Sequence, residues 1–417
     1  MNKSFLSLYK GLPRPIYVLS IATLINGIGS FIYPFLTLYL TVKLGYSASV
    51  AGVLTCIMGF MHVPGSLIGG KAADSLGRKL ICILGSAIGA VAMLACAFFE
   101  GKSWLVCLLF TVQFFDGITD PARSALMTDL TTPDNRQAAL SLTYLCYNLG
   151  FIVGPMIAGF LFYDHTRWIF IGPSIATVIS LFLVGFMVPE TKPDKAEIER
   201  SLKSADADKA EKGGLLKALA SRPRLLLFAV ACMFFSLAYA QNNFGLPLTL
   251  TDRLGKQGST IYGAVGSLNG LVVVLFNVPL INLLHKRKAL SNKILAGLLY
   301  IVGFGLLAFA QKPWMFFVLT FIFTIGEVID TTNTQYYVAN NTPKSHRARF
   351  DSVLPNIMYA GHSIGPIIAG TIADNLGLSW IWGFSVLFLG IGVAIIAMLS
   401  RTDKPIEDRG TEKELLP

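Results

Sequence analysis

Apolar segments of about twenty residues recur along almost the whole chain, and they constrain its fold more than any other feature. A helix of that length crosses the roughly 30 Å hydrocarbon layer of a bilayer. Charged residues make up only 14% of the chain, whereas they approach about a quarter of a soluble domain. We therefore predict an all-α membrane protein with twelve transmembrane helices. The predicted spans are residues 16–41, 48–70, 79–99, 104–127, 138–162, 167–188, 225–250, 260–284, 292–311, 314–337, 352–374 and 378–399.

The basic residues predict the orientation of these spans. If the N-terminus lies in the cytoplasm, most of the 34 Lys and Arg residues fall on cytoplasmic segments. The positive-inside rule then predicts a multi-pass protein of the cell inner (plasma) membrane with both termini cytoplasmic. The net charge of +10 could also suggest a nucleic-acid partner, but no basic face outside the spans is interleaved with aromatic residues. We expect the lipid bilayer, and no nucleic acid, as partner.

Nothing in the sequence predicts a metal, a cofactor or an enzyme. The six cysteines lie within apolar spans and lack the spacing of metal ligands. The nucleotide-binding pattern Gly-x4-Gly-Lys-Ser/Thr is absent from the sequence, so a gradient rather than a nucleotide is expected to supply energy.

A motif of glycines and a proline occurs twice and indicates two related halves. The copies are Gly150, Gly154, Pro155 and Gly159 in the fifth span, and Gly361, Gly365, Pro366 and Gly370 in the eleventh. They lie 211 residues apart (150 to 361), and Thr132-Pro133 before the first copy returns as Thr342-Pro343 before the second. Glycines allow close helix packing, and proline forms a kink or pivot. Plain helix packing is the alternative to a pivot.

A mixed-charge stretch separates the two halves and indicates a solvated linker. In repeats of this kind the binding site lies between the halves, near the middle of the bilayer. The predicted divisions are an N-terminal six-helix bundle at 1–188, a cytoplasmic linker at 189–224, a C-terminal six-helix bundle at 225–400 and a cytoplasmic tail at 401–417.

A short loop with an acid and two bases follows the second span. It runs from Gly70 to Lys79 and contains Asp74, Gly77 and Arg78. Glycines let helix ends approach closely, Asp74 can face a helix N-terminus, and Arg78 can pair with an acid on a neighbouring helix. The loop is therefore a candidate conformational latch. A simple cluster of basic residues at the cytoplasmic surface is the alternative.

The pattern Gly-x3-Asp-x2-Gly-Arg-Lys of this loop resembles the signature loop of the major facilitator superfamily. The resemblance covers essentially the whole chain and implies two pseudo-symmetric six-helix bundles. It also implies that Arg78 meets an acid at the cytoplasmic end of the fourth span, where Asp129 stands. The Gly154-Pro155 motif resembles an element of the drug:proton antiporter branch of the superfamily.

Ionisable residues within the spans are the candidates for function, because charges that face lipid are costly. Asp116, Asp120 and Arg123 share one face of the fourth span, and His62 lies in the second span, which lines the central cavity in this fold. Asp120 and Arg123 could form only a structural ion pair. Gln113 and Asp116 depart from the family pattern, which has an arginine and a glutamine there.

Glu327 and Asp330 share one face of the tenth span, which supplies no basic partner for either. A carboxyl group in a cavity of low polarity can exchange a proton with whichever side the cavity faces. An acid at the Glu327 position also resembles one used by some multidrug antiporters. These residues are expected to couple protons or bind solute.

Aromatic and amide side chains near these acids suit an amphipathic or cationic solute. We expect a proton-coupled secondary active transporter, working as a monomer by alternating access, that exports amphipathic or cationic drug-like compounds. Two alternatives stay open. One is a proton-coupled transporter of a specific metabolite such as a sugar, peptide or lipid intermediate. The other is a non-transporting membrane sensor or scaffold.

Overall fold

The computed structural model describes residues 9–132, 135–192, 222–341 and 347–401. Pro133, the Thr342-Pro343 pair, linker residues 193–221 and tail residues 402–417 lie outside these ranges. The helices are α1 (Arg14–Ile28), α2 (Ile32–Leu38), α3 (Ala48–Leu76), α4 (Arg78–Cys96), α5 (Trp104–Asp129), α6 (Arg136–Asp164), α7 (Trp168–Met187), α10 (Pro223–Tyr239), α11 (Gly245–Leu254), α12 (Gln257–Leu284), α13 (Ala289–Leu306), α14 (Pro313–Asn341), α15 (Arg347–Leu376) and α16 (Ser379–Arg401). The described residues contain no strand.

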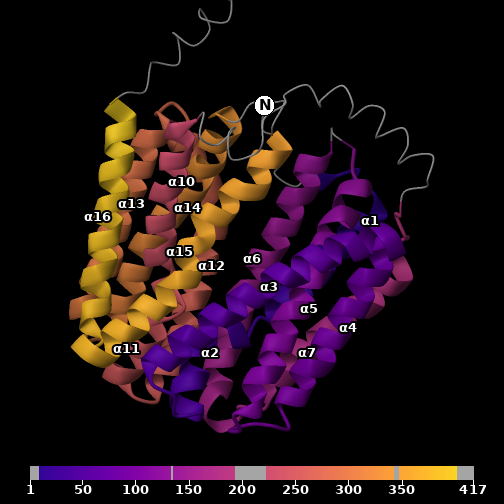
Figure 1. Ribbon diagram of the computed structural model, residues 1–417, viewed down its shortest axis with the longest axis horizontal. Helices are drawn as coiled ribbons and strands as arrows, with labels where there is room; N and C mark the ends of the chain where they lie inside the picture. The colour runs from indigo at the N-terminus through magenta and orange to yellow at the C-terminus, as the bar shows by residue number, and fades with distance from the viewer. Residues whose placement is uncertain (1–8, 133–134, 193–221, 342–346, 402–417) are drawn as a thin grey trace, which may run out of the picture.

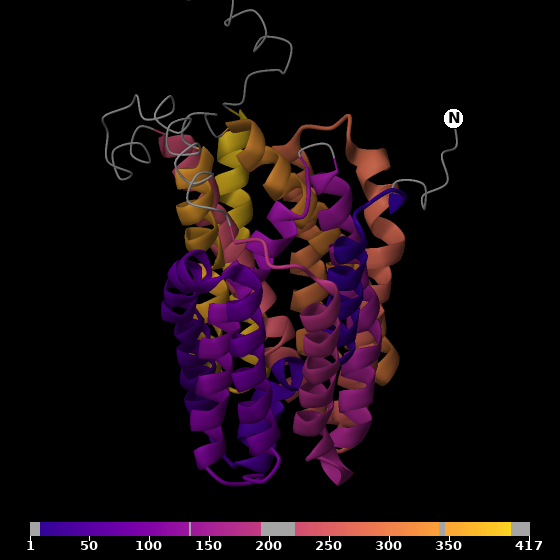
Figure 2. The same ribbon diagram turned by 90° about the vertical axis from the view of Figure 1, so that its right-hand side faces the viewer.

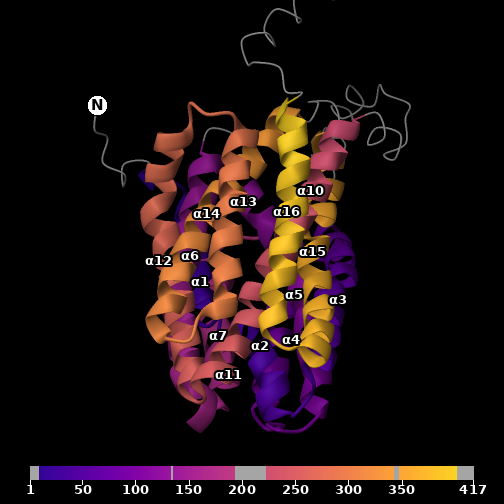
Figure 3. The ribbon, with the colours of Figure 1, turned by 90° about the vertical axis from the view of Figure 1, so that its left-hand side faces the viewer.

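The long helices run roughly parallel to one another in a single bundle (Figures 2 and 3). Helices α1–α7 lie on one side of the bundle and α10–α16 on the other (Figure 1). Helix α1 begins and α16 ends at the same end of the bundle, which we call the termini end. We call the other end the opposite end.

The predicted all-α membrane fold is confirmed. Eleven helical stretches among the described residues are long and apolar enough to cross a membrane. The remaining predicted span, 352–374, is the eleventh along the chain and lies within α15, which does not meet that standard. This helix is as long as its neighbours but carries polar residues such as Asn356 and His362, and it packs against α3 and α10.

Two of the predicted continuous spans are broken. The span at 16–41 is interrupted between α1 and α2, and the span at 225–250 is interrupted between α10 and α11 by a short turn, Ala240–Asn242. The two breaks lie at matching places in the repeat. The second break contains the polar run Gln241-Asn242-Asn243, but each segment as a whole is apolar enough to predict one continuous span.

The repeated glycine motif makes matching contacts in its two copies. A side chain at Gly150 would clash with the backbone of α1, and one at Gly361 would clash with the backbone of α10. At the far end of each motif the contact crosses to the other group of helices. Gly159 packs on Ser259 of α12, and Gly370 packs on Ala48 of α3. Each motif therefore joins its own helix both to its own group and to the other one.

The two groups of helices are fastened together at the opposite end. The Asp374 carboxylate of α15 accepts hydrogen bonds from the backbone N–H groups of Ala48 (3.1 Å) and Ser49 (2.8 Å) at the start of α3. A side chain at Gly52 would clash with the carbonyl of Pro366, and one at Gly263 with that of Pro155. These contacts hold α3 against α15 and α12 against α6. The division into two six-helix bundles at residues 1–188 and 225–400 stays a prediction.

Candidate functional site

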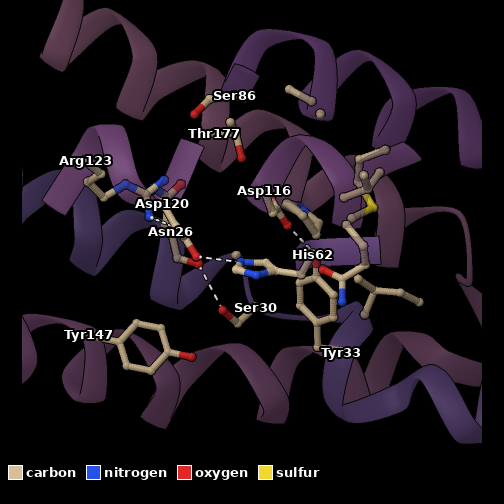
Figure 4. A pocket seen from close by; sticks show the side chains of 18 residues that line it. Asn26, Ser30, Tyr33, His62, Ser86, Asp116, Asp120, Arg123, Tyr147 and Thr177 are labelled. Carbon is tan, nitrogen blue, oxygen red and sulfur yellow. Dashed lines mark hydrogen bonds and ion pairs between the residues drawn. The ribbon is translucent and has the colours of Figure 1, made fainter. Parts of the chain in front are cut away.

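A cavity of about 430 Å³ lies among helices α1–α7 (Figure 4). Asp116, Asp120 and Arg123 of α5 all line it, as their helical spacing predicts. Its wall also contains Asn26, Ser30, Tyr33, His62, Gln113 and Tyr147. We call it the first cavity.

Asp116 and Asp120 have different partners in the first cavity. The Tyr33 hydroxyl of α2 donates to Asp116 Oδ2 at 2.5 Å. Asp120 lies 3.0 Å from His62 Nε2 of α3 and 3.7 Å from Arg123 Nη1. Among the described residues, Asp116 has no cation within ion-pair distance. Asp120 thus has a guanidinium group and an imidazole beside it, whereas Asp116 has a neutral hydroxyl.

A second cavity of about 280 Å³ lies among α10, α13, α14 and α15 and contains the other two predicted acids. Asn269 Nδ2 of α12 donates to Glu327 Oε2 at 2.7 Å and to Thr324 Oγ1 at 2.9 Å. Tyr239 of α10 lies beside Glu327 in the same cavity. Glu327 is therefore held by neutral groups, as Asp116 is.

Asp330 has a basic partner that the sequence reasoning missed. Lys293 of α13 is 1% exposed and its ammonium group contacts the Asp330 carboxylate. The same ammonium donates to Thr334 Oγ1 at 2.6 Å and lies 4.7 Å from the ring centre of Phe235. The tenth span indeed holds no base, but the neighbouring span does. A lysine just inside the predicted span 292–311 was the available signal.

The two cavities repeat one arrangement with a change. Asp116 and Glu327 are 211 positions apart (116 to 327), like the glycine motifs, and both face neutral donors. Each cavity also holds a second acid beside a cation. In the first cavity the cation, Arg123, lies on the same helix as its acid, whereas Lys293 comes from a neighbouring helix. The residue that corresponds to Lys293 in the first half is Cys82.

The aromatic and amide side chains that were expected near the acids are divided between the two cavities and the protein core. Tyr33, Tyr147 and Asn26 line the first cavity, whereas Tyr239 and Gln335 line the second. Phe244 and Tyr337 are buried in the apolar core, where they pack rather than face a cavity.

The predicted latch loop lies at the termini end. Arg78 forms an ion pair with Asp129, the contact that the family resemblance implies. Asp74 lies 4.0 Å from Arg78 and is 76% exposed, so it is the weaker partner. Gly77 has a φ of +126°, a backbone conformation that favours glycine. Gly70 has open space beside it, and the close helix approach occurs instead at Gly69, against Ile118.

Glu190, rather than Asp74, faces a helix N-terminus in this loop. Its carboxylate accepts hydrogen bonds from the N–H groups of Arg78 (2.8 Å), Lys79 (3.2 Å) and Leu80 (3.3 Å) at the start of α4. Burial opposes the charged form of Glu190, but the backbone hydrogen bonds from α4 and Thr191 outweigh it and lower its pKa. A carboxylate at this position is also favoured by the helix dipole.

The two residues after Glu190 also bind the latch loop. The Thr191 hydroxyl donates to Asp129 Oδ2 at 2.7 Å, and Lys192 Nζ donates to the Ser75 carbonyl at 2.5 Å. Three residues near the start of the predicted linker, Glu190, Thr191 and Lys192, are therefore docked on the loop. This contact joins segments distant in the sequence, so composition gave no sign of it.

The chain was compared with known families and proteins. The family model of the Major Facilitator Superfamily matches residues 19–329 and 293–416. The uncharacterised MFS-type transporter YttB of Bacillus subtilis is 25% identical over 97% of this chain and 100% of its own length. A Na(+), Li(+), K(+)/H(+) antiporter of Planococcus maritimus is 24% identical, covering 85% of this chain and 91% of its own. Multidrug resistance protein 1 of Bacillus subtilis is 24% identical, with 85% and 88% covered.

Solved structures show the same fold at low sequence identity. A POT family transporter in complex with 5-aminolevulinic acid superposes with a TM-score of 0.74 and 15% identity, covering 94% of this chain and 96% of that one. The nucleoside transporter NupG also gives a TM-score of 0.74, at 13% identity over 92% and 99% of the two chains.

Proposed function

Because this chain belongs to the Major Facilitator Superfamily and is a membrane transporter rather than an enzyme, we propose that it is a proton-coupled exporter of amphipathic or cationic compounds. The proposal rests on Asp116 and Glu327, which occupy matching positions in the two halves. Both acids face a cavity at matching positions of the repeat, and both are held by neutral hydroxyl or amide donors. Such a carboxyl group can take up and release a proton without breaking an ion pair.

The acid–base pairs beside these two residues indicate that the four acids have different roles. Asp120 lies beside His62 and Arg123, and Asp330 contacts Lys293, so their charges are already balanced. Protonating either acid would leave a cation uncompensated, which is costly away from water. We therefore assign proton exchange to Asp116 and Glu327, and structural or positioning roles to Asp120 and Asp330.

A negatively charged cavity would also attract a cationic solute. Proton and cation would then compete for the same carboxylates, which is the simplest basis for exchanging one for the other. The names of two relatives, a multidrug resistance protein and a cation/proton antiporter, agree with export of cations. Tyr33, Tyr147 and Tyr239 offer aromatic faces for an organic cation.

The placement of the halves supports alternating access. We propose that the termini end faces the cytoplasm, as the positive-inside rule indicates. The contacts of Asp374, Gly52 and Gly263 then close the outer side, and the protein adopts its inward-facing state. The loop from Gly70 to Lys79, with Asp129, would hold α3, α4 and α5 together at the cytoplasmic end and in this way stabilise one of the two facing states.

Transport by the purified protein in proteoliposomes with an imposed pH gradient tests the proposal. Several chemically unrelated organic cations, an alkali cation and a neutral sugar serve as candidate solutes. We expect gradient-dependent movement of more than one organic cation and mutual competition among them. Movement of a single metabolite without competition from organic cations would favour a dedicated metabolite carrier. Absence of any gradient-dependent flux would favour a sensor or scaffold.

A further inference from the structure

Arg123 is a cationic side chain that faces a cavity proposed to bind cations. Its side chain is 41% exposed, and it lines the first cavity together with Asp116 and Asp120. Figure 4 shows Arg123 at one side of this cavity and Asp116 at the other, with Asp120 between them. A guanidinium group in the wall repels a solute that is only a cation. Its position therefore points to a solute with a second kind of charge.

The protein satisfies the guanidinium group of Arg123 only in part. Its ion-pair partner is Asp120, whose Oδ1 lies 3.7 Å from Nη1, beyond ordinary hydrogen-bond distance. The other oxygen of Asp120 lies closer to His62 Nε2, at 3.0 Å. The Cys82 thiol of α4 is a further neighbour of Arg123, but sulfur is a weak acceptor. A guanidinium group carries five N–H donors, so donors remain for a ligand.

The corresponding cation of the second half is enclosed by the protein. Cys82 corresponds to Lys293 and Arg123 to Thr334, each 211 positions on (82 to 293 and 123 to 334). The contact between Cys82 and Arg123 thus recurs between α13 and α14 with the cation on the other helix. Lys293 is 1% exposed and contacts Asp330. Of these two cations, Arg123 is therefore the one that a solute can reach.

Asp116 gives the first cavity a negative group to accompany Arg123. The two residues are seven positions apart on α5, so their side chains start about 10 Å apart along the helix axis. Tyr33 donates a hydrogen bond to Asp116, and no cation within the described ranges lies at ion-pair distance from it. The cavity volume of about 430 Å³ is in the range of sites that hold drug-sized molecules. One solute can therefore meet both charges.

We propose that the first cavity selects amphoteric solutes, which are organic molecules with a carboxylate beside a cationic group. The cationic group lies at Asp116, and the carboxylate forms a bidentate ion pair with Arg123. Asp120 keeps His62 as its neighbour when the solute binds the guanidinium group. Arg123 is then a specificity-determining residue. The inference rests on the proposed transport of organic solutes and narrows their class.

Two rhodamine dyes that differ in one group test this role of Arg123. One dye has a free carboxylate and is a zwitterion at neutral pH, and the other is its methyl ester, which is a cation only. Fluorescence anisotropy measures the binding of each dye to the purified full-length protein in detergent. Unfolding temperatures verify that each variant folds.

The variants separate the two charges of the site. Arg123→Gln removes the cation, and Arg123→Lys keeps a charge without the bidentate geometry. Asp116→Asn removes the negative group at the other side. Arg167→Gln is the matched control, because Arg167 pairs with Glu100 outside the cavity and is mostly exposed. If Arg123→Gln does not fold, the double variant Asp120→Asn with Arg123→Gln removes the pair together and takes its place.

We expect wild type and Arg167→Gln to bind the carboxylate dye about ten-fold more tightly than the ester, the effect of one charge-assisted hydrogen-bonded pair. Arg123→Gln should abolish this preference by weakening the binding of the carboxylate dye alone, and Arg123→Lys should keep part of it. Asp116→Asn should weaken both dyes by a similar factor, because both carry the cation.

Equal affinity of wild type for the two dyes, or a preference that survives in Arg123→Gln, would overturn the inference. Gradient-driven flux of the ester in proteoliposomes, measured separately, tests the proposed function. Flux of the ester without any preference for the carboxylate dye would leave that function standing and refute the role of Arg123. Preference for the carboxylate dye without flux of either dye would refute the transport function and leave the binding role of Arg123.

Discussion

Lys293 and Asp330 form a buried ion pair between α13 and α14, and this contact separates the roles of two acids that lie one helical turn apart. In the part of the chain that the structure describes, the hydrogen-bond partners of Glu327 are an amide and a hydroxyl, whereas Asp330 has a cation that it must balance. From the sequence alone, neither acid had a basic partner within its span.

We expect Glu327→Gln to fold and insert normally but to lose gradient-driven transport of cations. Glutamine keeps the size of the side chain and most of its hydrogen bonding while removing titration. Asp116→Asn should behave in the same way, because Tyr33 can donate to the amide oxygen. Transport measured against pH in reconstituted vesicles, beside substrate binding, checks both variants. Unchanged pH dependence in Glu327→Gln would show that this carboxyl group is structural.

Asp330→Asn should destabilise the protein by about 3 kcal/mol, because it leaves the Lys293 ammonium buried without its counter-charge. The double variant Asp330→Asn with Lys293→Met removes both charges and should recover most of that loss. Unfolding temperatures in detergent, measured for the two single variants and the double variant, give the coupling between the residues. If the double variant is no more stable than Asp330→Asn alone, the ion pair is not the reason for the loss.

Arg78→Ala should slow transport much more than Asp74→Asn, because Arg78 contacts Asp129 whereas Asp74 is mostly exposed and 4.0 Å away. Substrate affinity should stay within a few-fold of wild type in both variants, since no residue of the loop lines either cavity. Equilibrium binding and initial flux rates, measured on the same preparations, separate the two effects. A loss of affinity as large as the loss of flux would place this loop at the substrate site.

Glu190→Gln should lower the unfolding temperature at neutral pH but not in acid. The pKa of Glu190 is below its usual value, so its stabilising effect is complete above about pH 4.5. That effect is lost as the pH falls through the lowered pKa, because the protonated acid no longer carries the negative charge that stabilises the start of α4. We expect a difference of about 1 kcal/mol or less, as for a charge at a helix end. A gap between the two proteins that stays constant down to pH 3 would contradict this account.

Gly263→Leu should prevent closure at the opposite end, because a side chain there meets the Pro155 carbonyl. Gly390→Leu is the control, since the space beside Gly390 is open. Hydrogen–deuterium exchange over the start of α3, residues 47–52, should rise in the first variant and not in the second. Similar exchange in both variants would mean that the contact between α6 and α12 does not hold this end closed.

The sequence predicted the helical membrane fold because each span has to be apolar over its own length, which is a local property. It also placed Asp116, Asp120 and Arg123 in one cavity, since residues three and four apart share a helix face. It missed Lys293, Glu190 and the breaks after α1 and α10. Lys293 and Glu190 act through contacts with other helices, which the pattern within one span does not show. Each break interrupts a stretch that is apolar on average over its length.

The origin of the cation in each half has a mechanical consequence. Asp120 and Arg123 lie on one helix, so no rigid movement of α5 can change their separation. Asp330 and Lys293 lie on different helices, so any sliding or rotation of α13 against α14 lengthens their contact at once. The contact between Asp120 and Arg123 is therefore insensitive to rigid helix displacement, whereas the contact between Asp330 and Lys293 registers that displacement as a change in electrostatic energy.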